Sequence, residues 1–215
     1  MRPSIGIPVE LAHRRNAVFR PRDLADVYAH PRAEVARLAK AGAVRRIATG
    51  YYALVPRHRL GDRTWSPDLA AAALGIGQAD YGVEPVALMG ASAARIHGAI
   101  PRALAAAVVA VPKQRPTLHT DRGKIVFVTR TVGALDIERT RTELGEGWLT
   151  TIEQTILDLA HRPTLGGIAQ EDAHEAIRAL AGRVDWTLTE QLAAMSHQPA
   201  AFKLALAVAG RVPRA

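Results

Sequence analysis

The positive charge of this chain is concentrated in its first 60 residues. That segment holds 12 lysines and arginines against 4 aspartates and glutamates, an excess of +8. Residues 61–215 hold 16 basic and 16 acidic side chains, which balance. So large a difference in net charge between two parts of a chain is typical of a polyanion-binding module joined to a neutral one. We therefore expect two domains, at residues 1–60 and 61–215.

The remaining composition favours a folded cytoplasmic protein. A length of 215 residues suffices for one large or two small domains, and 48% hydrophobic residues permit a packed core. The absence of cysteine excludes a disulfide framework and thiolate metal sites. No apolar run approaches the ~20 residues of a membrane span, and we expect neither a secretory signal nor a membrane partner.

The order of elements in residues 1–60 predicts a winged helix-turn-helix. A first helix ends in the basic stretch 13–16, a second spans residues 22–28, and a third begins at Pro31, where the missing N–H costs nothing. Val35 and Leu38 recur on one face of the third helix, as core positions of a helix do. Three short helices in this order are typical of a DNA-binding helix-turn-helix.

Two strands are expected directly after the third helix. Residues 43–47 and 51–55 alternate in polarity, and the loop 48–50 between them ends in glycine. A hairpin at this position would form the wing. The fold class predicted for the whole chain is α+β, a winged helix-turn-helix followed by a small α+β domain with a helical C-terminus.

The outer faces of these elements supply the candidate DNA contacts. Arg32, Arg37 and Lys40 fall opposite the apolar stripe of the third helix and are expected to approach the major groove. Thr49 lies at the tip of the wing, beside the backbone or minor groove. The expected phosphate contacts are Arg14, Arg15, Arg20, Arg22, Arg45 and Arg46. RNA is the alternative partner, but neither strand aromatics of the RNP type nor a GXXG clamp is present.

Residues 61–215 predict an α+β domain after a polar linker at 57–66. A capping box, Thr150-x-x-Glu153, is expected to start one of the helices. The expected helices are 67–74, 91–97, one ending near 160, 170–182, 188–195 and 200–209, and the expected strands are 107–111, 124–129 and one around Trp148.

The C-terminal part shows little sign of catalytic chemistry. Its sequence has no phosphate-binding glycine motif, no protein-kinase signature and no paired histidines at metalloprotease spacing. Ser92 and His97 fall five residues apart on one helix, which is a poor spacing for a mutual hydrogen bond. Asp158 lies in an apolar stretch and is interpreted as a buried hydrogen-bonding residue. We expect no catalytic residue, no metal and no cofactor.

Five stretches, in their order and spacing, resemble AbiEi-type antitoxins. These are transcriptional regulators from bicistronic toxin–antitoxin (abortive infection) operons. The stretches are VFRPRDL at 18–24, LAKAGAVRR at 38–46, GYYAL at 50–54, GASAARIHG at 90–98 and LTTIEQTILDLA at 149–160. The resemblance covers about residues 15–160. The family's usual arginine in the last stretch is Gln154 here.

The resemblance implies both a function and a partner. The protein would bind inverted or direct repeats in its own promoter as a repressor, and its C-terminal domain would counteract a nucleotidyltransferase-like toxin. One alternative makes the C-terminal domain a kinase-like enzyme that modifies the toxin by phosphoryl transfer. Another is a regulator with a small-molecule sensor domain, for which the sequence shows no ligand-binding signature.

Overall fold

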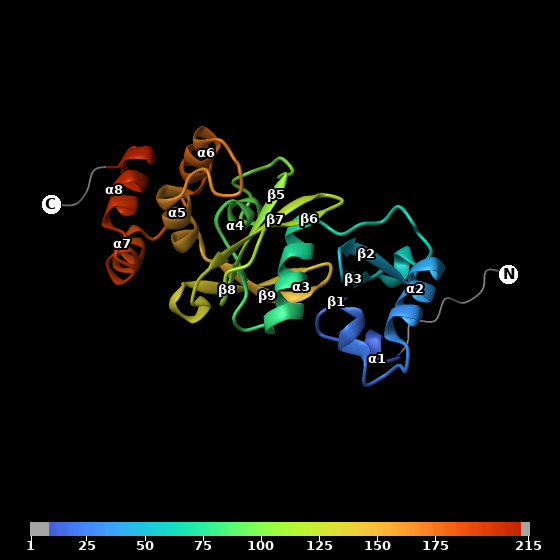
Figure 1. Cartoon of the computed structure of the whole chain (residues 1–215). Helices are drawn as coiled ribbons and strands as arrows, with labels where there is room; N and C mark the ends of the chain where they lie inside the picture. Colours follow the sequence, from blue (N-terminus) through green and yellow to red (C-terminus); the bar gives the residue numbers. More distant parts are fainter. Residues whose placement is uncertain (1–8, 212–215) are drawn as a thin grey trace.

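The chain folds around one mixed nine-stranded sheet, described for residues 9–211 in a computed structural model (Figure 1). The strand order is β1-β3-β2-β6-β7-β5-β4-β9-β8, and only β4–β9 and β5–β7 pair in parallel. The strands are β1 (Val18–Phe19), β2 (Val44–Ala48), β3 (Tyr51–Leu54), β4 (Ala87–Leu88), β5 (Ala106–Val111), β6 (Leu118–Thr120), β7 (Gly123–Thr129), β8 (Ile137–Thr142) and β9 (Gly145–Thr150).

The predicted winged helix-turn-helix is wrong. Within residues 9–60, α1 (Val9–Ala12) is a single turn, and in place of a helix at 22–28 there is only the 3₁₀ turn η1 (Pro21–Leu24). Proline disfavours helical geometry in the residue before it, so Pro31 stops any helix from running through His30. The expected wing strands exist as β2 and β3, but β2 also pairs with β6 and so belongs to the large sheet.

The third predicted helix is confirmed as α2 (Pro31–Ala41). Pro31 occupies its first turn, and Gly42 ends it in the left-handed conformation at φ 75°. Val35 and Leu38 are buried, as the apolar stripe predicted. The local signals of this helix are therefore sufficient to define it.

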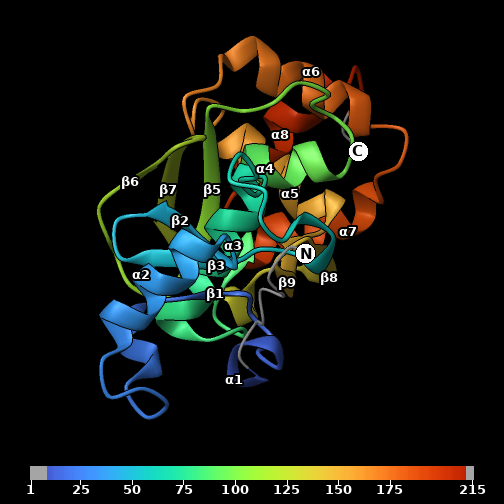
Figure 2. The same ribbon diagram turned by 90° about the vertical axis from the view of Figure 1, so that its right-hand side faces the viewer.

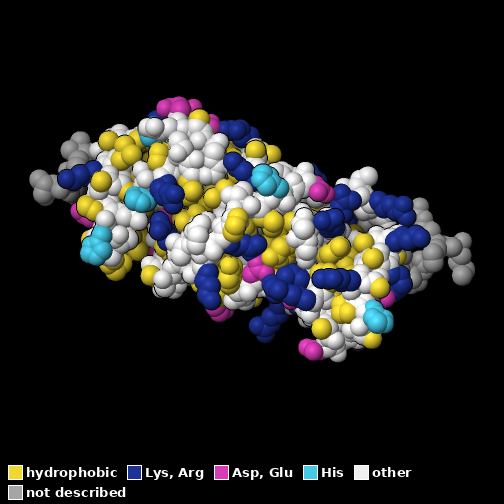
Figure 3. Space-filling model, in the orientation of Figure 1, with side chains coloured by type: hydrophobic (Ala, Val, Ile, Leu, Met, Phe, Trp, Pro, Cys, Tyr) yellow, Lys and Arg dark blue, Asp and Glu magenta, His cyan; other side chains and the backbone are white. Residues whose placement is uncertain are grey.

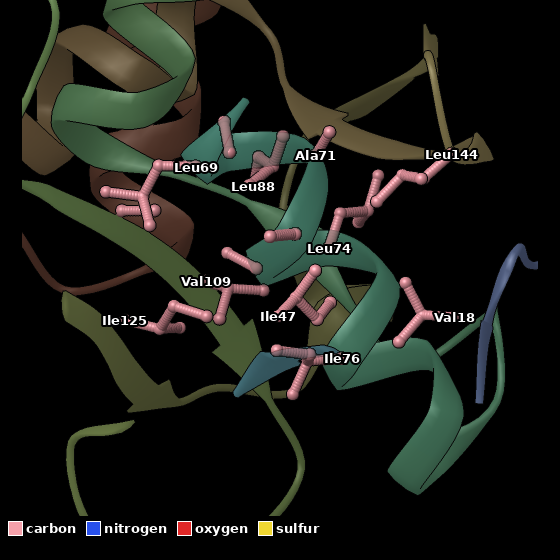
Figure 4. Packing of buried hydrophobic residues seen from close by; sticks show 14 of the residues in the cluster. Val18, Ile47, Leu69, Ala71, Leu74, Ile76, Leu88, Val109, Ile125 and Leu144 are labelled. Atoms are coloured by element: carbon pink, nitrogen blue, oxygen red, sulfur yellow. The ribbon is translucent and has the colours of Figure 1, made fainter. Parts of the chain in front are cut away.

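Helix α3 (Leu69–Tyr81) lies at the centre of the molecule. Its residues Leu69–Gln78 are all buried, because β1 and β5 pack closely against the helix and side chains of β2, β3 and β7 join the same core cluster (Figure 4). The largest core cluster accordingly joins Val18 and Ile47 with Val109 and Ile125. Side chains from before and after residue 60 share this core.

Five further helices complete the C-terminal part. The first packs against β5 and β9, and the other four lie at the end of the molecule away from α2 (Figures 1 and 2). The five are α4 (Gly90–Ile96), α5 (Ile152–His161), α6 (Gln170–Leu180), α7 (Trp186–Met195) and α8 (Pro199–Val208). The expected helical C-terminus is therefore present. The N-cap of α5 is Thr151, whose side chain accepts from the Gln154 amide, whereas the expected cap Thr150 is buried at the end of β9. No helix among residues 9–211 has the length and apolarity needed to cross a membrane.

Candidate nucleic-acid interface

The outer face of α2 carries the three cations that the sequence placed there. Arg32, Arg37 and Lys40 are all exposed, whereas Val35 and Leu38 between them are buried. Arg37 donates to the Glu34 carboxylate through Nε at 3.0 Å and Nη2 at 2.6 Å. The hydrogen bond from Arg37 lowers the pKa of Glu34. Exposed pairs of this kind contribute little free energy, so a DNA phosphate or base edge can replace Glu34.

The β2–β3 hairpin presents Arg45, Arg46 and Thr49 next to this helix. Arg46 is exposed, and its Nη2 donates to Thr49 Oγ1 at 3.3 Å. Arg45 is more tightly held. Its Nη1 donates to the Arg63 carbonyl oxygen at 2.8 Å, and its Nη2 pairs with Asp121 Oδ2 at 3.1 Å.

An open groove of about 570 Å³ separates the β2–β3 hairpin from the β6–β7 hairpin. The two hairpins meet through one strand pair, Ala48 with Thr120, and both residues line the groove. We call this feature the interhairpin groove. It is lined by Ala39, Val44, Arg45, Arg46, Ala48, Thr49, His119, Thr120 and Asp121.

Further exposed cations lie on the segment that the sequence predicted to be a linker, and one of them, Arg63, contacts the groove residue Arg45. Arg57, Arg59 and Arg63 are exposed, and Arg63 Nη2 donates to the Lys40 carbonyl oxygen at 3.3 Å. Sequence reasoning missed these three because the stretch reads as a polar connection. Figure 3 shows dark blue side chains gathered over the end of the molecule where α2 and β2–β3 lie.

Arg20, predicted to contact phosphate, lies inside an ionic network. Its Nη1 pairs with Asp80 at 2.5 Å and its side chain is only 18% exposed. The same carboxylate accepts from Tyr51 Oη at 2.8 Å and from Arg115. Burial raises the pKa of Tyr51. The network connects η1 and β3 to α3 and to the loop after β5. The Arg20 guanidinium is therefore held in contacts within the protein.

The other three predicted phosphate ligands lie away from the groove. Asn16 bridges to Gly145, which places Arg14 and Arg15 beside the turn between β8 and β9. Arg15 is exposed and Arg14 half-buried. Arg22 is exposed on η1. The structure therefore brings Arg45, Arg46 and Thr49 together beside the α2 cations, and leaves these three apart.

The histidine, serine and aspartate of the C-terminal part do not form a shared site. His97 Nε2 hydrogen-bonds to the Thr150 carbonyl oxygen at 2.8 Å, while Ser92 Oγ accepts from the Val108 amide at 2.8 Å. Asp158 is buried and hydrogen-bonded to Gln154, which confirms its interpretation. Among residues 9–211 no group of three or more histidine or acidic side chains is arranged to hold a metal.

No protein-family model matches this chain, and no curated protein matches it. The resemblance to AbiEi-type antitoxins stays a prediction from the five sequence stretches.

Proposed function

We propose that this protein binds double-stranded DNA through the outer face of α2 and the interhairpin groove. The observation that carries the proposal is the location of the excess charge. The +8 excess of the first 60 residues includes exposed cations at one end of the molecule, among them Arg32, Lys40 and Arg46. A cationic surface of this kind attracts phosphate independently of sequence and holds the duplex in register.

Helix α2 is the element best suited to read bases. It spans 11 residues and carries Arg32 and Arg37 on its exposed face. The major groove of B-DNA is about 12 Å wide and admits one α-helix, and arginine pairs with guanine there through two hydrogen bonds. Arg46 and Thr49 lie on the adjacent hairpin and would contact the backbone beside the helix. This docking does not require a winged helix-turn-helix.

The biological role proposed is that of an antitoxin and promoter repressor. It would bind repeats in the promoter of its own operon and counteract a nucleotidyltransferase-like toxin. The support for this role is the order and spacing of the five stretches that resemble AbiEi-type antitoxins. The C-terminal helices α5–α8 lie at the end opposite the cationic surface, so one chain has room for DNA and a protein partner together.

The first prediction concerns the helix. Replacing Arg32 or Arg37 by alanine should weaken binding to duplex DNA from the chain's own promoter by about 1–3 kcal/mol wherever the arginine reads a base edge. Fluorescence anisotropy at fixed salt measures the change. Lys203→Ala on α8 removes one exposed positive charge at the far end and should leave the affinity unchanged. A folded Arg32/Arg37 double variant with wild-type affinity would remove α2 from the interface.

A further inference from the structure

The pairing of Arg45 in the interhairpin groove is incomplete. Asp121 takes only Nη2, and Nη1 is occupied by the Arg63 carbonyl oxygen. The remaining donor, Nε, is buried and has no hydrogen-bond partner within residues 9–211. Nε and Nη2 form the edge of a guanidinium that binds two oxygens of one phosphate or carboxylate side by side. Asp121 uses half of that edge.

Asp121 is held at this place by the turn between β6 and β7. Thr120 Oγ1 accepts from the Arg122 amide at 3.2 Å and donates to the Gly123 carbonyl oxygen at 3.0 Å. Gly123 has φ 142°, and a Cβ there would collide with the Ala105 carbonyl oxygen. Arg122 Nη2 also donates to the Ser66 carbonyl oxygen at 3.2 Å. The turn therefore has a defined shape that keeps the carboxylate in front of Arg45.

The hairpin that carries Asp121 is otherwise basic. His119 and Lys124 are paired across β6 and β7, and both side chains are exposed, as is that of Arg122. These residues belong to the part of the chain whose net charge is zero, so charge counting assigned them no role. Of the three, His119 lines the groove together with Arg46, whereas Arg122 bonds to Ser66 and Lys124 Nζ lies beside Gly167. His119 therefore continues the basic surface across the groove, beyond residue 60.

We infer that the DNA interface extends onto the β6–β7 hairpin, and that the Asp121 carboxylate binds the Arg45 guanidinium at the place where a DNA backbone phosphate would bind. A phosphate entering the groove takes Nε and Nη2 together and displaces the Asp121 carboxylate. The carboxylate can leave because the side chains of Arg45 and Asp121 are 34% and 57% exposed and such pairs are weak. Nε is buried while Asp121 is in place and becomes available in the same exchange. Asp121 thereby lowers affinity for any polyanion. The inference rests on the proposed DNA binding and adds a second hairpin and a built-in competitor to it.

The test is removal of the competitor. Asp121→Asn should bind a labelled 30-base-pair promoter duplex roughly fivefold more tightly at 0.1 M salt, because Arg45 no longer has to give up a carboxylate before it binds the phosphate. Glu190→Gln on α7 removes the same charge far from the groove, so it serves as the control and should change affinity less than about twofold.

Combining Asp121→Asn with Arg45→Ala tests whether the effect of Asp121 on DNA affinity depends on Arg45. In an Arg45→Ala background, Asp121→Asn should give no more gain than Glu190→Gln, because the released donor edge is absent. Thermal unfolding of each variant confirms that it is folded. If Asp121→Asn gains no more than Glu190→Gln while wild type binds the duplex, this inference is wrong and the proposed function stands. If no variant binds duplex DNA, the proposed function itself is wrong.

Discussion

A single buried carboxylic acid, Asp158, sets how the C-terminal core responds to pH. The side chain accepts from Gln154 Nε2 at 3.2 Å and lies 3.4 Å from the Gly90 amide. Burial raises the pKa of Asp158 to about 7, against the lowering effects of these two donors and of the more distant Arg130. Ionising this group in the folded protein is therefore costly at neutral pH.

This pKa predicts a pH-dependent stability. Between about pH 4 and pH 7 the folded chain keeps a proton on Asp158 that the unfolded chain has released, so the free energy of unfolding falls as pH rises through that window. Asp158→Asn removes the ionisable group. Compared with wild type, the variant should therefore lose less stability between pH 5 and pH 7.5.

Urea unfolding of both proteins at the two pH values measures the effect. Glu190→Gln, an exposed change of the same chemical kind, should follow wild type at both. Parallel pH profiles for wild type and Asp158→Asn would contradict the buried-acid explanation.

At the scale of elements, the contact of β1 with α3 depends on one glycine. A Cβ at Gly75 would collide with Val18 Cγ2, and Asn16 Nδ2 donates to the Gly75 carbonyl oxygen at 2.8 Å. Gly75→Ala should destabilise the protein by about 1–3 kcal/mol through overpacking, although alanine is the better helix former.

A double-mutant cycle identifies the cause. Val18→Ala alone leaves a cavity, but in combination with Gly75→Ala the two changes should offset each other in part. Gly182→Ala has open space around its Cβ and serves as the control. Strict additivity of the two free-energy changes would show that the cost of Gly75→Ala arises elsewhere.

The elements that sequence reasoning found are those with local signals. Pro31 and Gly42 bracket α2, and α6 has an amphipathic pattern that places Ile177 and Leu180 inside. Strands β6 and β8 were missed because their sequences, LHT and IERTRT, are largely polar and gain their conformation from pairing with distant strands. The helix expected at 22–28 has suitable apolar spacing, yet the proline after His30 and the bonds from Arg20 to Asp23 favour a tight turn.

The residues of the candidate interface also divide into those with local sequence signals and those that only the tertiary fold brings together. The exposure of Arg32, Arg37 and Lys40 follows from helix periodicity, so the sequence sufficed to place them. The partner of Arg45, Asp121, lies 76 positions along the chain, and only the tertiary fold brings them together. Arg20 and Asp80 are separated by 60 positions. Nothing near Arg20 in the sequence indicates this ion pair, so Arg20 was predicted to contact phosphate.

At the scale of the whole molecule, the two expected domains share one hydrophobic core. The boundary expected at residue 60 falls in an exposed segment, but buried side chains from before and after it pack together. Val18, Ile47 and Ala53 pack in the same cluster as Leu74 and Val109. A fragment of residues 1–60 would expose this apolar surface to water, which a chain of that size cannot compensate. We expect the two parts to unfold together.

Brief trypsin treatment tests this expectation. Cleavage at Arg57, Arg59 or Arg63, all exposed, should leave two pieces that co-elute in size-exclusion chromatography, and the intact chain should show one thermal transition. The intact Arg57→Gln/Arg59→Gln/Arg63→Gln variant should resist cleavage in this segment. Separate elution of two folded pieces, each with its own transition, would establish two independent domains.

The two ends of the sheet also determine how copies of this protein behave when crowded. Unpaired strand edges attract strands from other chains and seed aggregation. Here one end is β1, only two residues long, and the other is β8, with exposed charges at Glu138, Arg139 and Arg141. Neither edge offers a long apolar template. The rim of the sheet therefore resists strand addition from another molecule, even at high protein concentration.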